Sequence, residues 1–181
     1  FHLIGEESWM GESFLNSKKF YFPKSIDYKK IEYLNISTNF QVDLNDLIKF
    51  ENLSELKFNN HLFELNQNYR DLPALKKLKK LIFSIGYSAK EDETTKINKI
   101  EELVELEELE MDLQTFNRDD EFEAIVPVDL KKIHTLTNLK KLKLNGLHLP
   151  FLKDIGKLDK LKNFELLNPH IVLSNSGEDF L

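Results

Sequence analysis

The chain contains no cysteine, and this absence removes several kinds of chemistry at once. Thiol nucleophiles, disulfide bonds and thiolate metal sites all need cysteine. The sequence also lacks a glycine-rich phosphate loop and a serine elbow, and its histidines are not paired at metal-ligand spacing. Ser54 and Lys57 match a Ser-x-x-Lys spacing, but they fall in a segment that reads as extended, where the two side chains do not meet. We therefore expect no catalytic residue, no cofactor and no metal.

An excess of positive charge is missing as well. The 181 residues carry a formal net charge of -6, and the only arginines are Arg70 and Arg118. A general nucleic-acid binder needs a basic surface to neutralise phosphates, and arginine is the side chain best suited to grip them. We expect no nucleic-acid partner.

Long hydrophobic runs are absent too, since every apolar run is far shorter than a membrane span. The opening segment lacks the basic start and apolar centre of a signal peptide. We expect no membrane partner, and these absences favour the cytoplasm. A chain that starts at Phe1 could also have lost a leader or be a fragment, so the compartment stays open.

What the chain does contain is a recurring apolar triplet. Two apolar residues flank a single residue, and a third apolar residue lies three positions upstream. The six copies are Ile31, Leu34, Ile36; Leu53, Leu56, Phe58; Leu78, Leu81, Phe83; Leu106, Leu109, Met111; Leu139, Leu142, Leu144; and Leu161, Phe164, Leu166. Since side chains two positions apart share one face of a strand, each triplet predicts a short strand with its apolar face turned to the core.

This pattern resembles the leucine-rich repeat family, in particular the short bacterial type found in internalins, with the middle repeats enlarged by insertions. The resemblance implies an α/β fold: a curved right-handed solenoid with a parallel concave sheet and short helices or turns on the convex side. It implies a recognition surface and not a reaction. We expect an amino-terminal cap over residues 1–30, about six repeats over residues 31–173 and a tail over residues 174–181.

The aromatic residues before the first repeat fit such a cap, because a bare end would expose the core of the solenoid. They include Trp9, Phe14, Phe20 and Phe22. A ligand-binding aromatic patch is the alternative.

Apolar residues at helical spacing between the strands predict short convex helices. The segments are Leu44, Leu47, Ile48; Ile97, Ile100, Leu103, Val104; Leu130, Ile133, Leu136; and Leu152, Ile155, Leu158.

Three columns of residues should face solvent on the concave side, about 4.8 Å apart from strand to strand. They read Tyr33, Glu55, Lys80, Glu108, Lys141, Asn163; Asn35, Lys57, Ile82, Glu110, Lys143, Glu165; and Ser37, Asn59, Ser84, Asp112, Asn145, Leu167. Opposite charges that alternate down a column stabilise a sheet without any ligand. Alternatively, Glu108, Glu110 and Asp112 form an acidic stripe for a basic peptide. Tyr33, Ile82 and Leu167 are candidate apolar anchors.

Two insertions, at residues 86–99 and 114–127, are further candidates for specificity, because loops often carry it. The acids Asp119, Asp120, Glu121 and Glu123 in the second insertion favour solvated charge, since the alternation and central glycine of a calcium loop are missing.

We expect a non-catalytic module that binds a protein or peptide through the concave face and the adjacent loops. The candidate partner-binding residues are Tyr33, Lys80, Ile82, Ser84, Glu108, Glu110, Asp112, Lys141, Lys143, Phe116 and Phe122. Two alternatives remain: the targeting arm of a larger protein such as an effector enzyme, and a structural unit that self-associates through its carboxy-terminal coil.

Overall fold

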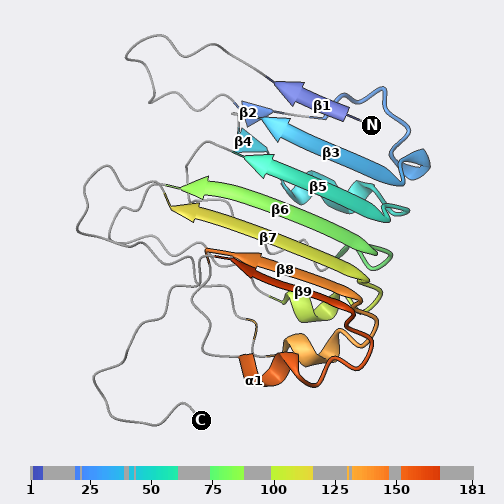
Figure 1. Cartoon of the computed structure of the whole chain (residues 1–181). Coiled ribbons are helices and arrows are strands. Elements are labelled where there is room, and N and C mark those ends of the chain that lie inside the picture. Colours follow the sequence, from blue (N-terminus) through green and yellow to red (C-terminus); the bar gives the residue numbers. More distant parts are fainter. Residues whose placement is uncertain are drawn as a thin grey trace.

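A single parallel sheet of seven strands organises the part of the chain that the computed structural model describes. The described residues are 2–5, 19–20, 22–38, 41–42, 44–60, 74–87, 99–115, 130, 132–146 and 152–167. The strands are β1 (His2–Gly5), β3 (Tyr33–Thr38), β5 (Glu55–Asn60), β6 (Lys80–Tyr87), β7 (Glu108–Thr115), β8 (Lys141–Asn145) and β9 (Asn163–Leu167). They lie side by side in chain order, each parallel to the next (Figure 1). The strands predicted from the triplets, and the parallel sheet that the resemblance implies, are confirmed.

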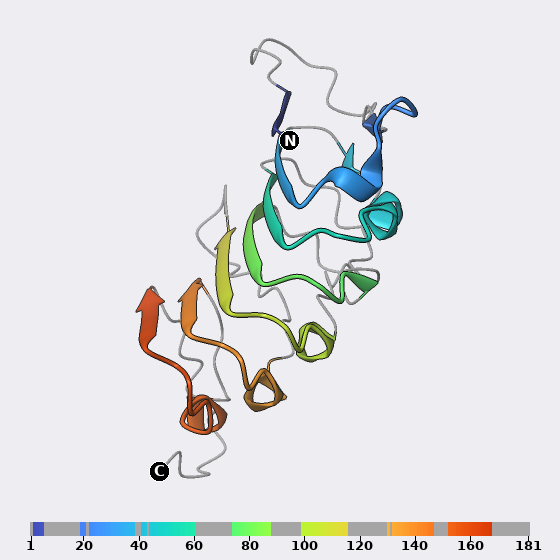
Figure 2. The same cartoon turned by 90° about the vertical axis from the view of Figure 1, so that its right-hand side faces the viewer.

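The remaining described elements are short. They are β2 (Lys19–Phe20) and β4 (Gln41–Val42), which pair with each other, the 3-10 helices η1 (Tyr28–Lys30), η2 (Leu44–Lys49), η4 (Ile100–Glu102) and η5 (Ile133–Thr135), and the α-helix α1 (Leu152–Ile155). Figure 2 shows the strands of the large sheet along the inner side of an arc and the short helices along its outer side. None of the helices in the described ranges is long and apolar enough to cross a membrane.

The described chain passes six times from the outer side into a strand of the large sheet. We call these passages units 1 to 6: residues 22–38, 44–60, 74–87, 99–115, 132–146 and 152–167. The strands of successive units pair in one constant register, so equivalent residues of the triplets lie next to one another. Leu56 faces Leu81, and Leu81 in turn faces Leu109. The register predicted for the apolar triplets is therefore confirmed.

The hydrophobic core lies between the sheet and the outer helices, in rows that run from unit to unit. Two rows come from the strands: Leu34, Leu56, Leu81, Leu109 and Leu142, then Ile36, Phe58, Phe83, Met111 and Leu144. Another two come from the outer side: Phe50, Leu75, Leu103, Leu136 and Leu158, then Leu47, Ile100, Ile133 and Ile155. All of these side chains are buried. Burial of such continuous rows is the main stabilising contribution available to the fold.

A ladder of backbone hydrogen bonds joins the units where each strand begins. In every step, one carbonyl accepts hydrogen bonds from two consecutive N–H groups of the next unit. The carbonyls belong to Glu32, Ser54, Lys79, Glu107 and Lys140. This ladder satisfies main-chain groups that would otherwise be left without partners at the bend into each strand.

Two asparagine side chains reinforce the joints between units. Asn52 donates its amide to the carbonyl oxygen of Lys29 at 2.7 Å, and Asn138 donates to the carbonyl of Val104 at 3.1 Å. A lysine of the following unit donates back to each amide oxygen, Lys77 to Asn52 at 2.6 Å and Lys160 to Asn138 at 2.8 Å. The apolar triplets do not predict these joints.

The outer side departs from the sequence-based expectation. Ile48 and Val104, counted above among the apolar helical positions, are 53% and 50% exposed. For Ile48 the reason is geometric, since it lies in the 3-10 helix η2, which has three residues per turn and does not turn the same residues inward as an α-helix does. Val104 lies beyond the end of η4.

The amino-terminal residues contain a strand that the triplet did not predict. β1 pairs with β3 and extends the sheet past unit 1. Phe22 is buried, and its ring packs edge-on against Phe50 at 5.2 Å between centroids. The side chains of Trp9, Phe14 and Phe20 lie outside the described set, so the cap stays a prediction.

Candidate functional site

The candidate residues on the sheet lie on the face opposite the core. Because triplet residues point inward, the residues between them point to the other face of the strands. The half-buried candidates are Tyr33, Lys80, Ile82, Ser84, Glu108, Glu110, Asp112, Lys141 and Lys143. The strand pairing places them in the three predicted columns. The other two candidates, Phe116 and Phe122, lie outside the described residues.

The charged candidates on this face are linked by ion pairs. Lys80 Nζ lies 3.0 Å from Glu108 Oε2, and Lys141 Nζ lies 2.6 Å from Glu110 Oε1. Lys143 Nζ lies 3.2 Å from Glu165 Oε2 in the next strand. Two acids of the stripe, Glu108 and Glu110, therefore have lysine partners on opposite sides, on β6 and β8.

The closest of these pairs changes the ionisation of its lysine. The hydrogen bond from Lys141 to Glu110, helped by the charges of that carboxylate and of Glu108 and Glu165, holds the pKa of Lys141 above its usual value of 10.5. Lys141 is thus a firmly charged group at the centre of the face.

The third column holds hydroxyl and amide side chains together with the carboxylate of Asp112. Asn145 donates its amide to Asp112 Oδ1 at 2.8 Å. On β5, the amide oxygen of Asn59 is buried and accepts no hydrogen bond among the described residues. Ser84 lies between Asn59 and Asp112 in the register. The column offers hydroxyl, amide and carboxylate groups at strand spacing, which suits hydrogen bonding to a peptide backbone.

The apolar candidates differ in how far they reach solvent. Tyr33 and Ile82 are half-buried, while Leu167 at the end of the third column is 42% exposed. Phe164, predicted to point into the core, is 43% exposed. Its direction along the strand is as expected, but no described unit follows unit 6 to cover it.

Positive and negative side chains are concentrated in different units. The predicted columns alone did not reveal this. Unit 3 carries four lysines and no carboxylate, and so does unit 5. Unit 4, between them, carries seven carboxylates and one lysine. A count of charges over whole units of the sequence, and not only over the predicted columns, would have revealed this separation of lysines from carboxylates.

The same alternation holds together the edge where the strands begin. Lys140 Nζ lies 2.6 Å from Glu107 Oε2. That hydrogen bond, with the charges of Lys140, Lys79 and Lys160, holds the pKa of Glu107 below its usual value of 4.5.

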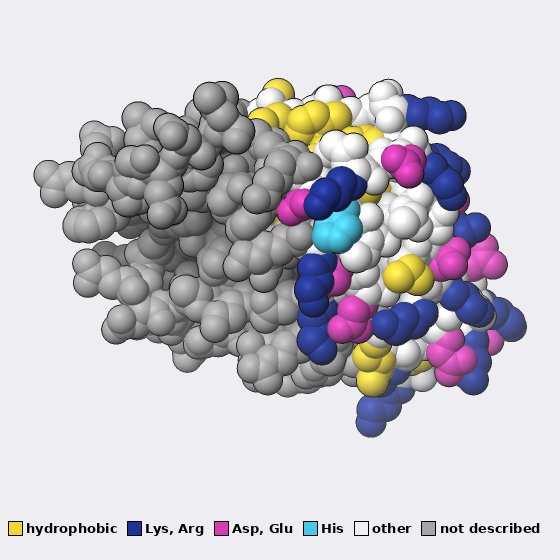
Figure 3. Space-filling view, turned by 90° about the horizontal axis from the view of Figure 1, so that it is seen from below, with side chains coloured by type: hydrophobic (Ala, Val, Ile, Leu, Met, Phe, Trp, Pro, Cys, Tyr) yellow, Lys and Arg dark blue, Asp and Glu magenta, His cyan; other side chains and the backbone are white. Residues whose placement is uncertain are grey.

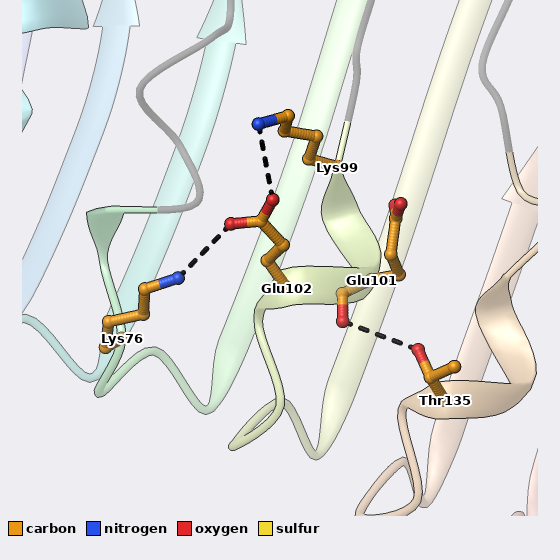
Figure 4. A network of polar contacts seen from close by, with 5 residues as sticks. All are labelled: Lys76, Lys99, Glu101, Glu102 and Thr135. Atoms are coloured by element: carbon orange, nitrogen blue, oxygen red, sulfur yellow. Dashed lines mark hydrogen bonds and ion pairs between the residues drawn. The ribbon is translucent and has the colours of Figure 1, made fainter.

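On the outer side, Glu102 lies between two lysines (Figure 4). Lys76 Nζ and Lys99 Nζ are each 3.4 Å from one of its carboxylate oxygens, and the hydrogen bond from Lys76 is the largest cause of a lowered pKa of Glu102. Nearby, the Thr135 hydroxyl of unit 5 donates to the carbonyl of Glu101 at 3.4 Å. Unit 4 thus contacts its basic neighbours, units 3 and 5, on the concave face, at the edge where the strands begin and on the outer side.

No cluster of three or more histidine, aspartate or glutamate side chains within the described ranges could hold a metal ion. The hydroxyl of Ser54 donates to the carbonyl of Glu32 at 3.0 Å, and Lys57 lies on β5 in the extended geometry expected. The acids Asp119, Asp120, Glu121 and Glu123 lie outside the described ranges.

Comparison with known proteins adds no relative: no family model matches the sequence, and no curated protein is significantly similar to it.

Proposed function

We propose that the chain is a leucine-rich-repeat solenoid that acts as a non-catalytic binding module for a protein or an extended peptide. The binding surface is the concave face of units 3 to 5, with the two inserted loops beside it. The observation that carries the proposal is the constant strand register, which aligns three columns of polar and charged side chains across the face opposite the core.

The ion pairs on this face are compatible with binding. Each pair joins partly exposed groups, so it contributes little in water and a ligand group can replace one partner at small cost. A basic ligand side chain could take the place of Lys80 at Glu108 or of Lys141 at Glu110. The displaced lysines would stay in contact with water.

Ile82 supplies an apolar contact at the centre of the same surface. It pairs in register with Glu110, and its neighbours on the same face of its own strand are Lys80 and Ser84. Interface energy concentrates in a few side chains that lose their water, with charged groups around them setting specificity. The ligand that fits best has an apolar residue for Ile82 next to a basic residue for Glu108 or Glu110.

Affinity capture from the source organism's lysate tests the proposal with three baits. These are the wild type, the concave variant Glu108→Lys/Glu110→Lys, and an edge control, Glu32→Lys/Glu105→Lys. The two acids of the control are exposed, lie off the concave columns and undergo the same change of charge. The proposal predicts a protein that the wild type and the edge control retain and the concave variant loses. Retention by all three baits would place binding elsewhere.

A further inference from the structure

The outer edge of β9 ends the sheet, and within the described residues no strand pairs with it. The N–H of Asn163 and the carbonyl of Leu167 both bond inward, to unit 5. Since the backbone groups of successive residues point to opposite sides of a strand, those of Phe164 and Leu166 point outward. The edge therefore presents backbone donors and acceptors in the arrangement that another strand could use.

An apolar row lies beside this edge. Phe164 is 43% exposed and Leu161 and Leu166 are only partly buried, whereas the residues equivalent to Phe164 in units 1 to 5 are buried leucines. In those units the following unit covers the row. Figure 3 views this end of the molecule and shows hydrophobic side chains among lysines and carboxylates. Unit 6 thus exposes the kind of surface that units 1 to 5 use to bind their neighbour.

Charge indicates which strand would fit. Lys162 is exposed, and no ion pair joins it to a carboxylate of the described residues. Its equivalent in unit 3 is Lys79, whose carbonyl accepts from the N–H groups of Glu107 and Glu108. The charge of Lys79 also acts on the carboxyl of Glu107. Unit 3 is therefore followed by an acidic strand, and Lys162 occupies in unit 6 the position that Lys79 occupies in unit 3.

We propose that the outer edge of β9 binds an extended acidic segment of another protein by parallel strand addition. The segment carries a carboxylate beside Lys162, with apolar side chains two residues apart that cover Phe164 and Leu166. The carbonyl of Lys162 accepts from two consecutive N–H groups of the segment, as the carbonyl of Lys79 does within the chain. Backbone pairing supplies affinity, and the side chains supply selectivity. This surface is separate from the concave face.

The chain's own unit 4 supplies the probe. A fluorescein-labelled peptide with the sequence of residues 101–112, EELVELEELEMD, carries the strand that natively follows a basic unit. Fluorescence anisotropy of this peptide with the full chain should show saturable binding. Lys162→Glu should weaken it by about fivefold or more, since an attraction becomes a repulsion. A peptide with lysine at the Glu107 position should recover affinity for that variant. Lys24→Glu, an exposed charge change in unit 1, should leave binding unchanged.

A second peptide separates strand addition from charge attraction. N-methylation of the nitrogen at the Glu108 position keeps every side chain and every charge, but removes one N–H that the carbonyl of Lys162 would accept. Strand addition predicts that this peptide binds much more weakly than the parent. Equal binding of the two peptides, or equal binding of the parent to wild type and Lys162→Glu, would overturn the proposal.

A second copy of the chain is the competing occupant of the edge. Light scattering over a concentration series should give the monomer mass throughout. A concentration-dependent doubling of mass that Phe164→Glu abolishes would assign the edge to self-association and overturn the proposal.

Discussion

Lys141 binds Glu110 diagonally and not Glu108, the residue directly opposite it in the strand register. Glu108 instead binds Lys80 on its other side, so two carboxylates of β7 are divided between the basic strands β6 and β8. The acidic strand is therefore held from both sides. Because the pairs are partly exposed, the arrangement fixes the register of neighbouring strands more than it adds to stability.

Neutralising both acids should lower stability only modestly. Glu108→Gln/Glu110→Gln removes two partly exposed ion pairs and should lower the free energy of unfolding by about 0.4–2 kcal/mol. The corresponding double reversal to lysine should cost more, since Lys80, Lys141 and Lys143 would then face like charges. Urea denaturation of the three proteins measures the order; a reversal no more costly than neutralisation would contradict it.

Substitutions in the core rows should lower stability more at the centre of the sheet than at its end. Leu109 and Phe164 occupy equivalent positions, but Leu109 is 0% exposed and Phe164 is 43% exposed. Leu109→Ala should lower the free energy of unfolding by about 2–5 kcal/mol, because it leaves a cavity. Phe164→Ala should cost less than about 2 kcal/mol, since nearly half of its surface is in water in the folded chain. Similar losses in denaturant titrations would show that unit 6 is covered.

The asparagine joint between units 4 and 5 should contribute measurably. Asn138→Ala removes the hydrogen bond to the Val104 carbonyl and the one from Lys160. We expect a loss of about 0.5–1.5 kcal/mol, because water can partly replace both partners. Thr137→Ala, an exposed neighbour, is the matched control and should change stability by less than about 0.5 kcal/mol. Thermal unfolding of both variants decides the point, and equal shifts would leave the joint without an energetic role.

Acid should weaken the edge where the strands begin. Glu107 has a pKa below 4.5 in the folded chain, so its pairing with Lys140 stabilises the fold above that value. The contribution is lost as pH falls through the lowered pKa. The stability difference between wild type and Glu107→Gln should therefore be constant near neutral pH and shrink below 4.5. Denaturant titrations between about pH 3 and about pH 7 test this; a difference that persists at the acid end would contradict it.

A rise to alkaline pH should weaken the pair formed by Lys141 and Glu110. The pKa of Lys141 is raised above 10.5, so its pairing with Glu110 is fully present below 10.5 and is lost as pH rises through the higher folded value. The variant Glu110→Gln should not show this loss of stability at high pH. An equal loss in the wild type and the variant would show that other groups cause it.

The sequence predicted the strands and their register because the apolar triplet has the period of a strand and recurs six times. It missed β1, since His2 to Gly5 carries no complete triplet. It grouped Ile48 and Val104 with the apolar residues of the convex helices, because the spacing of apolar residues shows neither the type of a short helix nor where it ends; Ile48 is exposed in the 3-10 helix η2, and Val104 lies beyond the end of η4.

The candidate face was predictable as a set of columns but not as a network. Alternation places Glu108 opposite Lys141, yet the side chain of Lys141 bonds to Glu110. The choice depends on rotamers and on competition from Lys80, which a one-dimensional pattern does not contain. The exposure of Phe164 has a similar origin, because periodicity gives the direction of a side chain but not what covers it.

The most direct test of the account is a titration of the purified captured partner against three forms of the full chain: wild type, Glu108→Lys/Glu110→Lys, and the edge control Glu32→Lys/Glu105→Lys. The account predicts a Kd raised by about tenfold or more for the concave variant and unchanged for the control, since the two variants carry the same net charge and differ only in where it lies. Equal Kd values for all three forms, with folding verified for each, would contradict binding at the concave face.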